Sequence, residues 1–305
     1  MLKPDERAHL VELLRPPADC KLDCAVGTTF SLDLISALML PLSFAFFDWE
    51  QTDGKLIADP LAMLEALRRY GNRFTVFCQS GQIRLPTTYQ RLITFLEPCI
   101  YDVAAPDPKG VFHPKVWALR FLASDEKVRY RVLCLSRNLT FDRCWDTVVA
   151  LDGELTDRSN AISANYPLAE FVAALPKLAT RPLARERRQD ITKVSDELKK
   201  VRFNWPEGFD GSQCRFWAGG LDARPTAPFG TRRDKSLIVS PFLSNGVICD
   251  FLDRSGGTHI VSRPESLQEI PQETLKQWAL REFVWVDFAQ FLIRAPEACR
   301  SGPSA

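Results

Sequence analysis

His113 and Lys115 are the residues of this sequence whose types and spacing best suit chemistry at an anionic group. Of the three histidines, His9 lies in a charged N-terminal stretch and His259 lies in a run that predicts a buried strand. Residues two apart on a strand point to the same side, so His113 and Lys115 can both face one ligand. An imidazole and an ammonium group on one face predict a site for an anion.

A second group of polar side chains follows about twenty residues later, where the next strand is predicted to end. Ser136 and Thr140 can donate hydrogen bonds from their hydroxyls, and Asn138 can donate from its amide. Arg137 can bind phosphate oxygens in a fork. Two apolar runs joined by the polar link ASDEK are typical of a β-hairpin, which brings the start of one strand beside the end of the next. We therefore expect the two groups to lie together.

The order HPK followed by SRNLT resembles the HxK…GSxN pattern of the phospholipase D superfamily, especially its nuclease-like branch, as in bacterial restriction and phage-defence proteins. The resemblance is close over residues 111–146 and looser before them. It implies an α/β fold with a mixed sheet flanked by helices. It also implies a metal-independent phosphodiesterase, a nuclease acting on DNA in preference to RNA, with no cofactor. No membrane partner is expected, because neither a secretion signal nor an amphipathic membrane helix is evident.

The resemblance assigns a role to each motif residue. His113 attacks phosphorus and forms a phosphohistidine, while Lys115 and Asn138 stabilise the non-bridging oxygens. Covalent catalysis divides one difficult displacement into two steps, and preorganised donors stabilise the charge on the oxygens. The other implied site residues are Ser136, Arg137 and Thr140, which bind substrate, and Asp146, with Asp152 or Glu154 as alternatives, which orients the histidine.

The sequence departs from the family pattern at two positions: Arg120 stands where an Asp often follows the lysine, and Leu135 stands where a Gly precedes the serine. The chain also holds one motif, whereas the family's active site needs two that face each other. Either two chains form a homodimer and share one site, or a continuation or partner chain supplies the second motif. The alternative function is a catalytically inactive subunit for nucleic-acid binding or assembly.

Apolar runs separated by helical stretches predict the elements that position these residues. The predicted strands are residues 24–29, 73–78, 115–121, 128–135 and 147–151, and the predicted helices begin at Phe30, at Pro60 and near Thr88. Thr28, Thr29 and Ser31 are expected to cap the first helix in preference to binding a phosphate.

Three regions are expected along the chain. Residues 1–178 form a phospholipase D-like domain with one HxK…SxN motif, and residues 179–234 form a charged helix, interpreted as a solvated face, and an irregular connection. Residues 235–305 form a partial second α/β lobe that lacks the motif. In that lobe, residues 236–241 and 258–263 echo residues 22–29 and 73–80.

Composition limits the partners and the compartment. The chain has 39 Lys and Arg against 38 Asp and Glu, so any basic patch for nucleic acid must be local. Nine cysteines without a CxxC pair and few histidines argue against a zinc site and suit free buried thiols in a reducing cytoplasm. Residues 32–47 are the most apolar stretch, but they are too short for a membrane helix and are interpreted as core.

Overall fold

The computed structural model describes residues 9–50, 60–88, 91–108, 110–142, 144, 146–221, 234–246, 248–249 and 258–274. The chain divides into two compact units, Met1–Pro225 and Thr226–Ala305. Within the described ranges, no helix is both long and apolar enough to cross a membrane.

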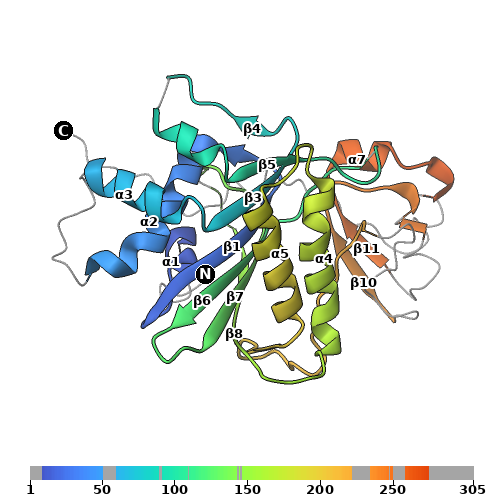
Figure 1. Cartoon of the computed structure of the whole chain (residues 1–305). Coiled ribbons are helices and arrows are strands. Elements are labelled where there is room, and N and C mark those ends of the chain that lie inside the picture. The colour runs from blue at the N-terminus through green and yellow to red at the C-terminus, as the bar shows by residue number, and fades with distance from the viewer. Residues whose placement is uncertain are drawn as a thin grey trace, which may run out of the picture. The chain divides into compact units, whose positions relative to one another are not determined.

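A seven-stranded mixed sheet lies at the centre of the described part of the first unit, in the order β5-β3-β1-β6-β7-β8-β9 (Figure 1). Strands β1, β3 and β5 run parallel, whereas β6 is antiparallel to β1 and β6 to β9 pair antiparallel in chain order. The predicted α/β fold with a mixed sheet flanked by helices is confirmed. The strands are β1 (Cys20–Thr29), β3 (Phe74–Gln79), β5 (Ile100–Val103), β6 (Val116–Ala123), β7 (Val128–Leu135), β8 (Val148–Leu155) and β9 (Val201–Phe203).

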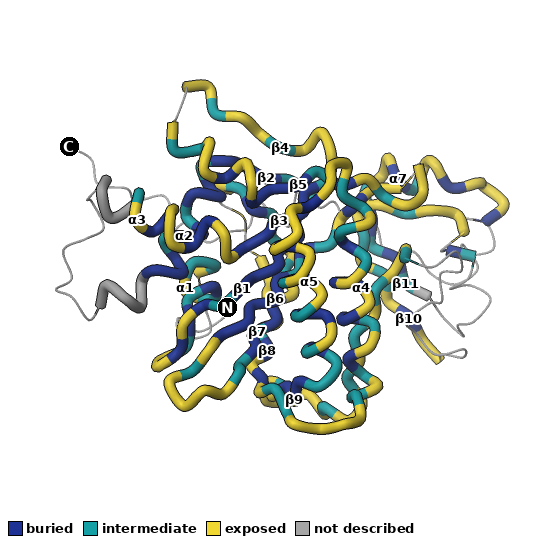
Figure 2. The backbone as a smooth tube through the Cα atoms, in the orientation of Figure 1, coloured by how far each residue is buried: buried dark blue, intermediate teal, exposed yellow. Residues whose placement is uncertain are grey.

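Helices cover both faces of this sheet, and each face has its own apolar core. The first core contains residues from α1 (Leu10–Leu14), α2 (Leu34–Glu50) and α3 (Pro60–Tyr70). The second core contains residues from α4 (Tyr166–Leu178) and α5 (Arg185–Leu198), which lie side by side over the sheet (Figure 1). Figure 2 shows the central strands largely buried between these layers. A short sheet, β2 (Leu32–Asp33) with β4 (Ile83–Arg84), and 3-10 turns at Arg91–Leu96 and Ser163–Asn165 complete the unit.

A β-bulge in β1 determines which of its residues face each core. The pairing of β1 with β6 shifts between Leu22 and Cys24, so that Asp23 is an extra residue on β1. Leu22 and Ala25 consequently pack in the first core although they are three residues apart, while Cys24 and Val26 pack in the second.

Arg120 fills a structural position in the second face of the sheet. Its guanidinium donates to the Asp23 carboxylate at 2.7 Å and to the Glu197 carboxylate at 2.7 and 3.0 Å. The Tyr130 hydroxyl donates to the same Glu197 at 2.6 Å. Two carboxylates around one buried guanidinium offset the water that it loses. Arg120, which stands where the motif pattern often has Asp, therefore joins β6 to α5.

Helix α5 is part of the first unit, whereas its charged sequence was interpreted as a solvated helix beyond residue 178. Ile191, Val194 and Leu198 are buried and form one stripe of the helix. Strand β9 then adds to the sheet beside β8. The division between the units consequently falls after Pro225. Most residues of α5 are charged or polar, so its composition alone predicts an exposed helix and does not show the narrow apolar stripe.

The start of α2 is capped by Asp33. Its Oδ1 accepts hydrogen bonds from the backbone N–H of Ile35 at 2.8 Å and of Ser36 at 3.1 Å. The prediction that Thr28, Thr29 or Ser31 caps this helix was wrong, because Thr28 and Thr29 lie in β1 and Ser31 lies between β1 and β2, before the first turn of the helix.

The second unit is a small α/β unit with β10 (Ser236–Val239), β11 (Thr258–Val261) and α7 (Pro264–Gln268). Strands β10 and β11 pair in parallel, as β1 and β3 do. Ile248, Ile260 and Ile270 form its described core. This parallel pairing is what a repeat of the first strands requires, and the assignment of residues 235–305 to a partial phospholipase D-like lobe stays a prediction.

Four of the cysteines lie in buried positions of the first unit: Cys20, Cys24, Cys78 and Cys99. Burial raises the pKa of Cys78 to about 12 and that of Cys99 to about 11. These thiols therefore stay protonated near neutral pH and behave as small apolar groups.

Replacing Arg120 by Ala should lower the free energy of unfolding by about 3 kcal/mol, because two partly buried carboxylates would lose their cation. The measurement is urea denaturation followed by circular dichroism. Lys127→Ala is the control, since Lys127 pairs with Asp125 at 3.6 Å on an exposed turn and should leave the transition midpoint unchanged. Equal midpoints for the two variants would contradict the structural role of Arg120.

Candidate active site

His113 and Lys115 lie side by side just before β6, as their spacing predicted. The Lys115 Nζ lies 3.2 Å from each ring nitrogen of His113 and 3.5 Å from the His113 carbonyl oxygen. The Phe30 ring packs against the imidazole with the ring centroids 4.8 Å apart. His113 is exposed, so an imidazole held by two neighbours remains accessible to a ligand.

Lys115 is a buried cation, with 8% of its surface exposed. In the part of the chain that the structure describes, no carboxylate lies within ion-pair distance of its Nζ. A buried ammonium without a counter-ion is costly, and proteins keep such groups where a ligand supplies the opposite charge. Lys115 is therefore a candidate position for binding an anion.

The electrostatics of the pair keep the imidazole neutral. Burial and then the Lys115 cation lower the pKa of His113. Burial also lowers the pKa of Lys115, against the opposing effect of the Asp146 carboxylate. A neutral imidazole carries a lone pair on one ring nitrogen, which a nucleophile requires.

Two buried threonines at the end of β1 position the motif segments. Thr28 Oγ1 accepts a hydrogen bond from the Val116 N–H at 2.9 Å and donates to the Val116 carbonyl at 3.2 Å. Thr29 Oγ1 accepts from the Leu139 N–H at 3.0 Å and donates to the Ser31 carbonyl at 2.8 Å. The start of β6 and the loop after β7 are thus both attached to the end of β1.

Asn138 and His113 both contact the segment between β1 and β2: Asn138 contacts Ser31, and the His113 ring contacts Phe30. Its Oδ1 accepts a hydrogen bond from the backbone N–H of Ser31 at 3.4 Å, and Ser31 follows the Phe30 that packs on the imidazole. Among the described residues, none accepts a hydrogen bond from the Asn138 Nδ2. Its amide N–H groups therefore remain available to a ligand, as a role in binding phosphate requires.

The other predicted binding residues hold the loop after β7. Ser136 Oγ donates to Asp146 at 2.7 Å, and Arg137 donates to the same carboxylate at 3.3 Å. Arg137 also pairs with Asp142 at 3.0 Å and donates to the Thr140 carbonyl at 2.9 Å, while the Thr140 hydroxyl donates to Asp142 at 2.6 Å. The structure thus groups Ser136, Arg137, Thr140 and Asp146 in one network, and their direct contact with substrate stays a prediction.

The predicted orienting carboxylates have other partners. Asp146 binds Ser136 and Arg137, whereas the hydrogen bonds described for the His113 ring go to Lys115. The alternatives Asp152 and Glu154 lie on β8 directly opposite two arginines of β7 and pair with them, with Asp152 bound to Arg131 at 2.6 and 3.0 Å and Glu154 to Arg129 at 3.9 Å. The ammonium of Lys115 therefore takes the place beside the imidazole that was expected of a carboxylate.

Within the described ranges, no three His, Cys, Asp or Glu side chains gather into a group that could hold a metal ion.

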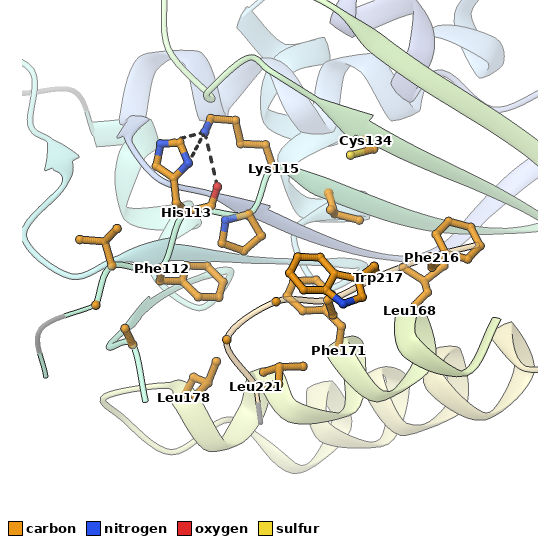
Figure 3. Close-up of a pocket in the computed structure, with 18 of the residues that line it drawn as sticks. Phe112, His113, Lys115, Cys134, Leu168, Phe171, Leu178, Phe216, Trp217 and Leu221 are labelled. Carbon is orange, nitrogen blue, oxygen red and sulfur yellow. Dashed lines mark hydrogen bonds between the residues drawn. The ribbon is translucent and has the colours of Figure 1, made fainter. Parts of the chain in front are cut away.

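A pocket of about 970 Å³ adjoins the pair. Figure 3 shows the His113 and Lys115 side chains on one side of their segment, and Phe112, Phe171 and Trp217 on the other. His113, Lys115 and Ser136 are among the lining residues, but the side chains of His113 and Lys115 point away from the aromatic residues of the pocket (Figure 3). The apolar part of the lining includes Phe112, Val132, Leu168, Phe171, Leu178, Phe216, Trp217 and Leu221.

Sequence reasoning missed this pocket, because the residues that follow the charged helix within 179–234 are expected to form an irregular connection. A signal was present in the alternation of side chains: Phe216 and Ala218 pack on the second core, whereas Trp217 between them is 49% exposed. Alternation of buried and exposed side chains over three residues does not by itself predict a pocket, because the other lining residues come from α4 and the sheet.

Comparison with protein-family models gives no match. Comparison with curated proteins also gives no match. Among solved structures, the chain is similar to a mutant of yeast tyrosyl-DNA phosphodiesterase at a TM-score of 0.37 and 11% identity, over 63% of this chain and 37% of that chain. The unmutated yeast enzyme is similar at a TM-score of 0.36 and 10% identity, over 62% of this chain and 37% of that chain. At these values the likeness assigns neither a family nor a function.

Replacing Lys115 by Met should raise the pKa of His113, because the substitution removes the neighbouring positive charge and keeps a side chain of similar length. The measurement is a titration of ¹³C-labelled histidine by NMR, with the His113 signal assigned from its loss in His113→Gln. In the parent protein the midpoint should lie below the ordinary histidine value. Lys127→Met is the charge-matched control, and the same midpoint in both variants would contradict the coupling of His113 to Lys115.

Proposed function

We propose that this chain is a metal-independent phosphodiesterase of the phospholipase D type, acting on nucleic acid and on DNA in preference to RNA. The observation that carries the proposal is the accessible His113 imidazole, kept neutral beside a buried Lys115 for which the described residues provide no ion-pair partner. The resemblance of HPK and SRNLT to the family motif supports it, and the same resemblance suggests a role in restriction or phage defence. The cysteine usage suits a cytoplasmic location.

In the first step, a ring nitrogen of His113 attacks phosphorus with its lone pair. A P–N bond forms and the P–O bond to the leaving group breaks, with the electron pair departing on oxygen. The Lys115 ammonium and the Asn138 amide donate to the non-bridging oxygens, on which negative charge is concentrated. A general acid gives the leaving oxygen its proton.

In the second step, water attacks the phosphohistidine. The group that acted as general acid now removes a proton from the water, a P–O bond forms, and the P–N bond breaks. The neutral imidazole of His113 is restored, and a phosphate monoester is released. The two steps together consume one water molecule for each phosphodiester bond.

The general acid is the second half of this site. A second copy of this chain, related by a two-fold axis, would supply another His113. A partner chain or a continuation of the chain would supply a second motif instead. Mass measurement of the active species separates these two arrangements, because the first requires a homodimer.

An inactive subunit for nucleic-acid binding or assembly is the second candidate function. It is favoured by Arg137, which pairs with Asp142 and Asp146 and is thereby occupied by carboxylates of its own loop. In such a subunit Lys115 would bind a phosphate that is not cleaved.

Purified protein should cleave labelled DNA in excess EDTA, and His113→Ala should lower the rate by at least about 10³-fold, because the nucleophile is removed. A gel assay with single- and double-stranded substrates measures the rate, with mass determined in parallel. Quenching at alkaline pH should trap phosphorus on the protein in a bond that acid breaks.

The matched control is His9→Ala, which removes a histidine of the described N-terminal segment outside the site and should cleave at the parent rate. Cleavage that EDTA abolishes, or that persists in His113→Ala, would refute the phosphohistidine mechanism. Binding of DNA with no cleavage by any assembly state would favour the inactive subunit.

A further inference from the structure

We propose that Phe30 is a positioning residue for His113, and that its ring holds the imidazole in the orientation from which a ring nitrogen reaches phosphorus. The inference rests on the proposed function, because the orientation of the imidazole matters to the reaction only if His113 is the nucleophile. It adds to that site a residue that lies outside both motif segments.

The imidazole of His113 needs a support other than a hydrogen bond in its own plane. The Lys115 Nζ lies 3.2 Å from both ring nitrogens. A point in the ring plane at that distance from both nitrogens would overlap a ring carbon, so the ammonium lies over a face of the ring. Among the described residues, no carboxylate or carbonyl oxygen accepts a hydrogen bond from either ring nitrogen. A second-shell acceptor, the usual means of orienting a functional histidine, is therefore not provided by these residues.

The Phe30 ring provides a contact that can orient the imidazole by packing. The two ring centroids are 4.8 Å apart and the ring planes are inclined at 49°. This separation lies within the range of about 4.5–7 Å at which aromatic rings attract each other. Because His113 is exposed, few other neighbours restrict its side chain. The phenyl ring occupies space that other orientations of the imidazole would need.

Packing of the fold does not account for an aromatic ring at position 30. Phe30 is half-buried. In the described part of the chain it belongs to neither of the two apolar cores of the first unit. The ring contact described for it is the one with His113. The phenyl ring is therefore better explained by its contact with the imidazole than by the stability of the sheet.

The backbone that carries Phe30 is held on both sides. The Cys78 thiol donates to the Phe30 carbonyl at 3.4 Å, and the Thr29 hydroxyl donates to the Ser31 carbonyl at 2.8 Å. The N–H of Ser31 donates to Asn138 Oδ1 at 3.4 Å. Consecutive residues of one anchored segment thus contact the imidazole of the first motif half and the amide of the second.

The size of the effect follows from the number of orientations that the ring can adopt. The first side-chain torsion of histidine has three staggered wells and the second is roughly two-fold, which gives about six orientations. An imidazole released from Phe30 would spend only part of its time in the productive one, so the rate should fall about five-fold. Lys115 and Asn138, which would bind the phosphate, keep their groups in place, so KM should not change.

The test uses the cleavage assay in excess EDTA with three variants of Phe30 and a control. Phe30→Leu, which removes the ring and keeps an apolar side chain, and Phe30→Met, which does the same with a flexible one, should both lower kcat about five-fold at unchanged KM. Phe30→Tyr keeps the ring and should retain the parent kcat. Phe209→Leu is the control, because Phe209 is a 60% exposed phenylalanine in the chain after β9. Circular dichroism at the assay temperature verifies that each variant is folded.

A spectroscopic measurement reports the orientation without any cleavage. In protein labelled with ¹³C and ¹⁵N at histidine, three-bond couplings across the first side-chain torsion of His113 distinguish one rotamer from an average of several. The signal is assigned from its loss in His113→Gln. The parent protein and Phe30→Tyr should show one rotamer, and Phe30→Leu should show averaged couplings.

The positioning role would be overturned by an unchanged kcat in Phe30→Leu, by a changed KM at constant kcat, or by equal losses in Phe30→Leu and Phe30→Tyr. A single His113 rotamer that persists in Phe30→Leu would overturn it as well. A parent protein that cleaves no DNA would refute the proposed function alone, and the couplings would then decide whether Phe30 holds the imidazole. Cleavage that depends on His113 but not on Phe30 would refute the positioning role alone.

Discussion

The candidate site depends on two buried hydroxyls at the carboxyl end of β1. Thr28 fixes the start of β6 through both backbone groups of Val116, and Thr29 fixes the loop after β7 through the N–H of Leu139. Sheet pairing alone leaves the chain free to diverge beyond each strand end. Because both threonines lie on one strand, the segments bearing His113 and Asn138 are held by neighbouring residues, although they are separated in sequence by a complete hairpin. The relative position of these two segments is therefore fixed by buried hydrogen bonds to β1.

The sequence allowed this neighbourhood to be predicted, because its cause is local. The hairpin of β6 and β7 is visible as two apolar runs with a polar link, and an antiparallel pair must bring the start of one strand to the end of the next. Residues two apart must share a side, which accounts for the contact between His113 and Lys115. The helix at residues 60–70 and the strand before residue 30 follow from the same kind of pattern.

What the sequence could not provide depends on contacts between distant segments. The choice of Asp33 as helix cap followed from where β2 ends, and the pairing of Asp152 with Arg131 followed from the register of β7 against β8. Arg120 was noted as a departure from a pattern, yet its partners come from β1 and α5. Each outcome was decided by a partner whose position only the folded sheet determines, and no local pattern contains that position.

The energetics of Lys115 link the stability of the fold to its proposed chemistry. Burying an ammonium without a carboxylate disfavours the charged form, and the lowered pKa of Lys115 is the sign of that cost. The same burial keeps water from competing for its hydrogen bonds. An arriving phosphate would replace the missing counter-ion, and the negative charge on its oxygens would meet a donor that needs no reorganisation. Filling the position with an internal carboxylate would stabilise the empty protein and remove the attraction for the anion. Among the described residues Lys115 has no ion-pair partner, and its burial is thus a local instability that a phosphate ligand, rather than the fold, would relieve.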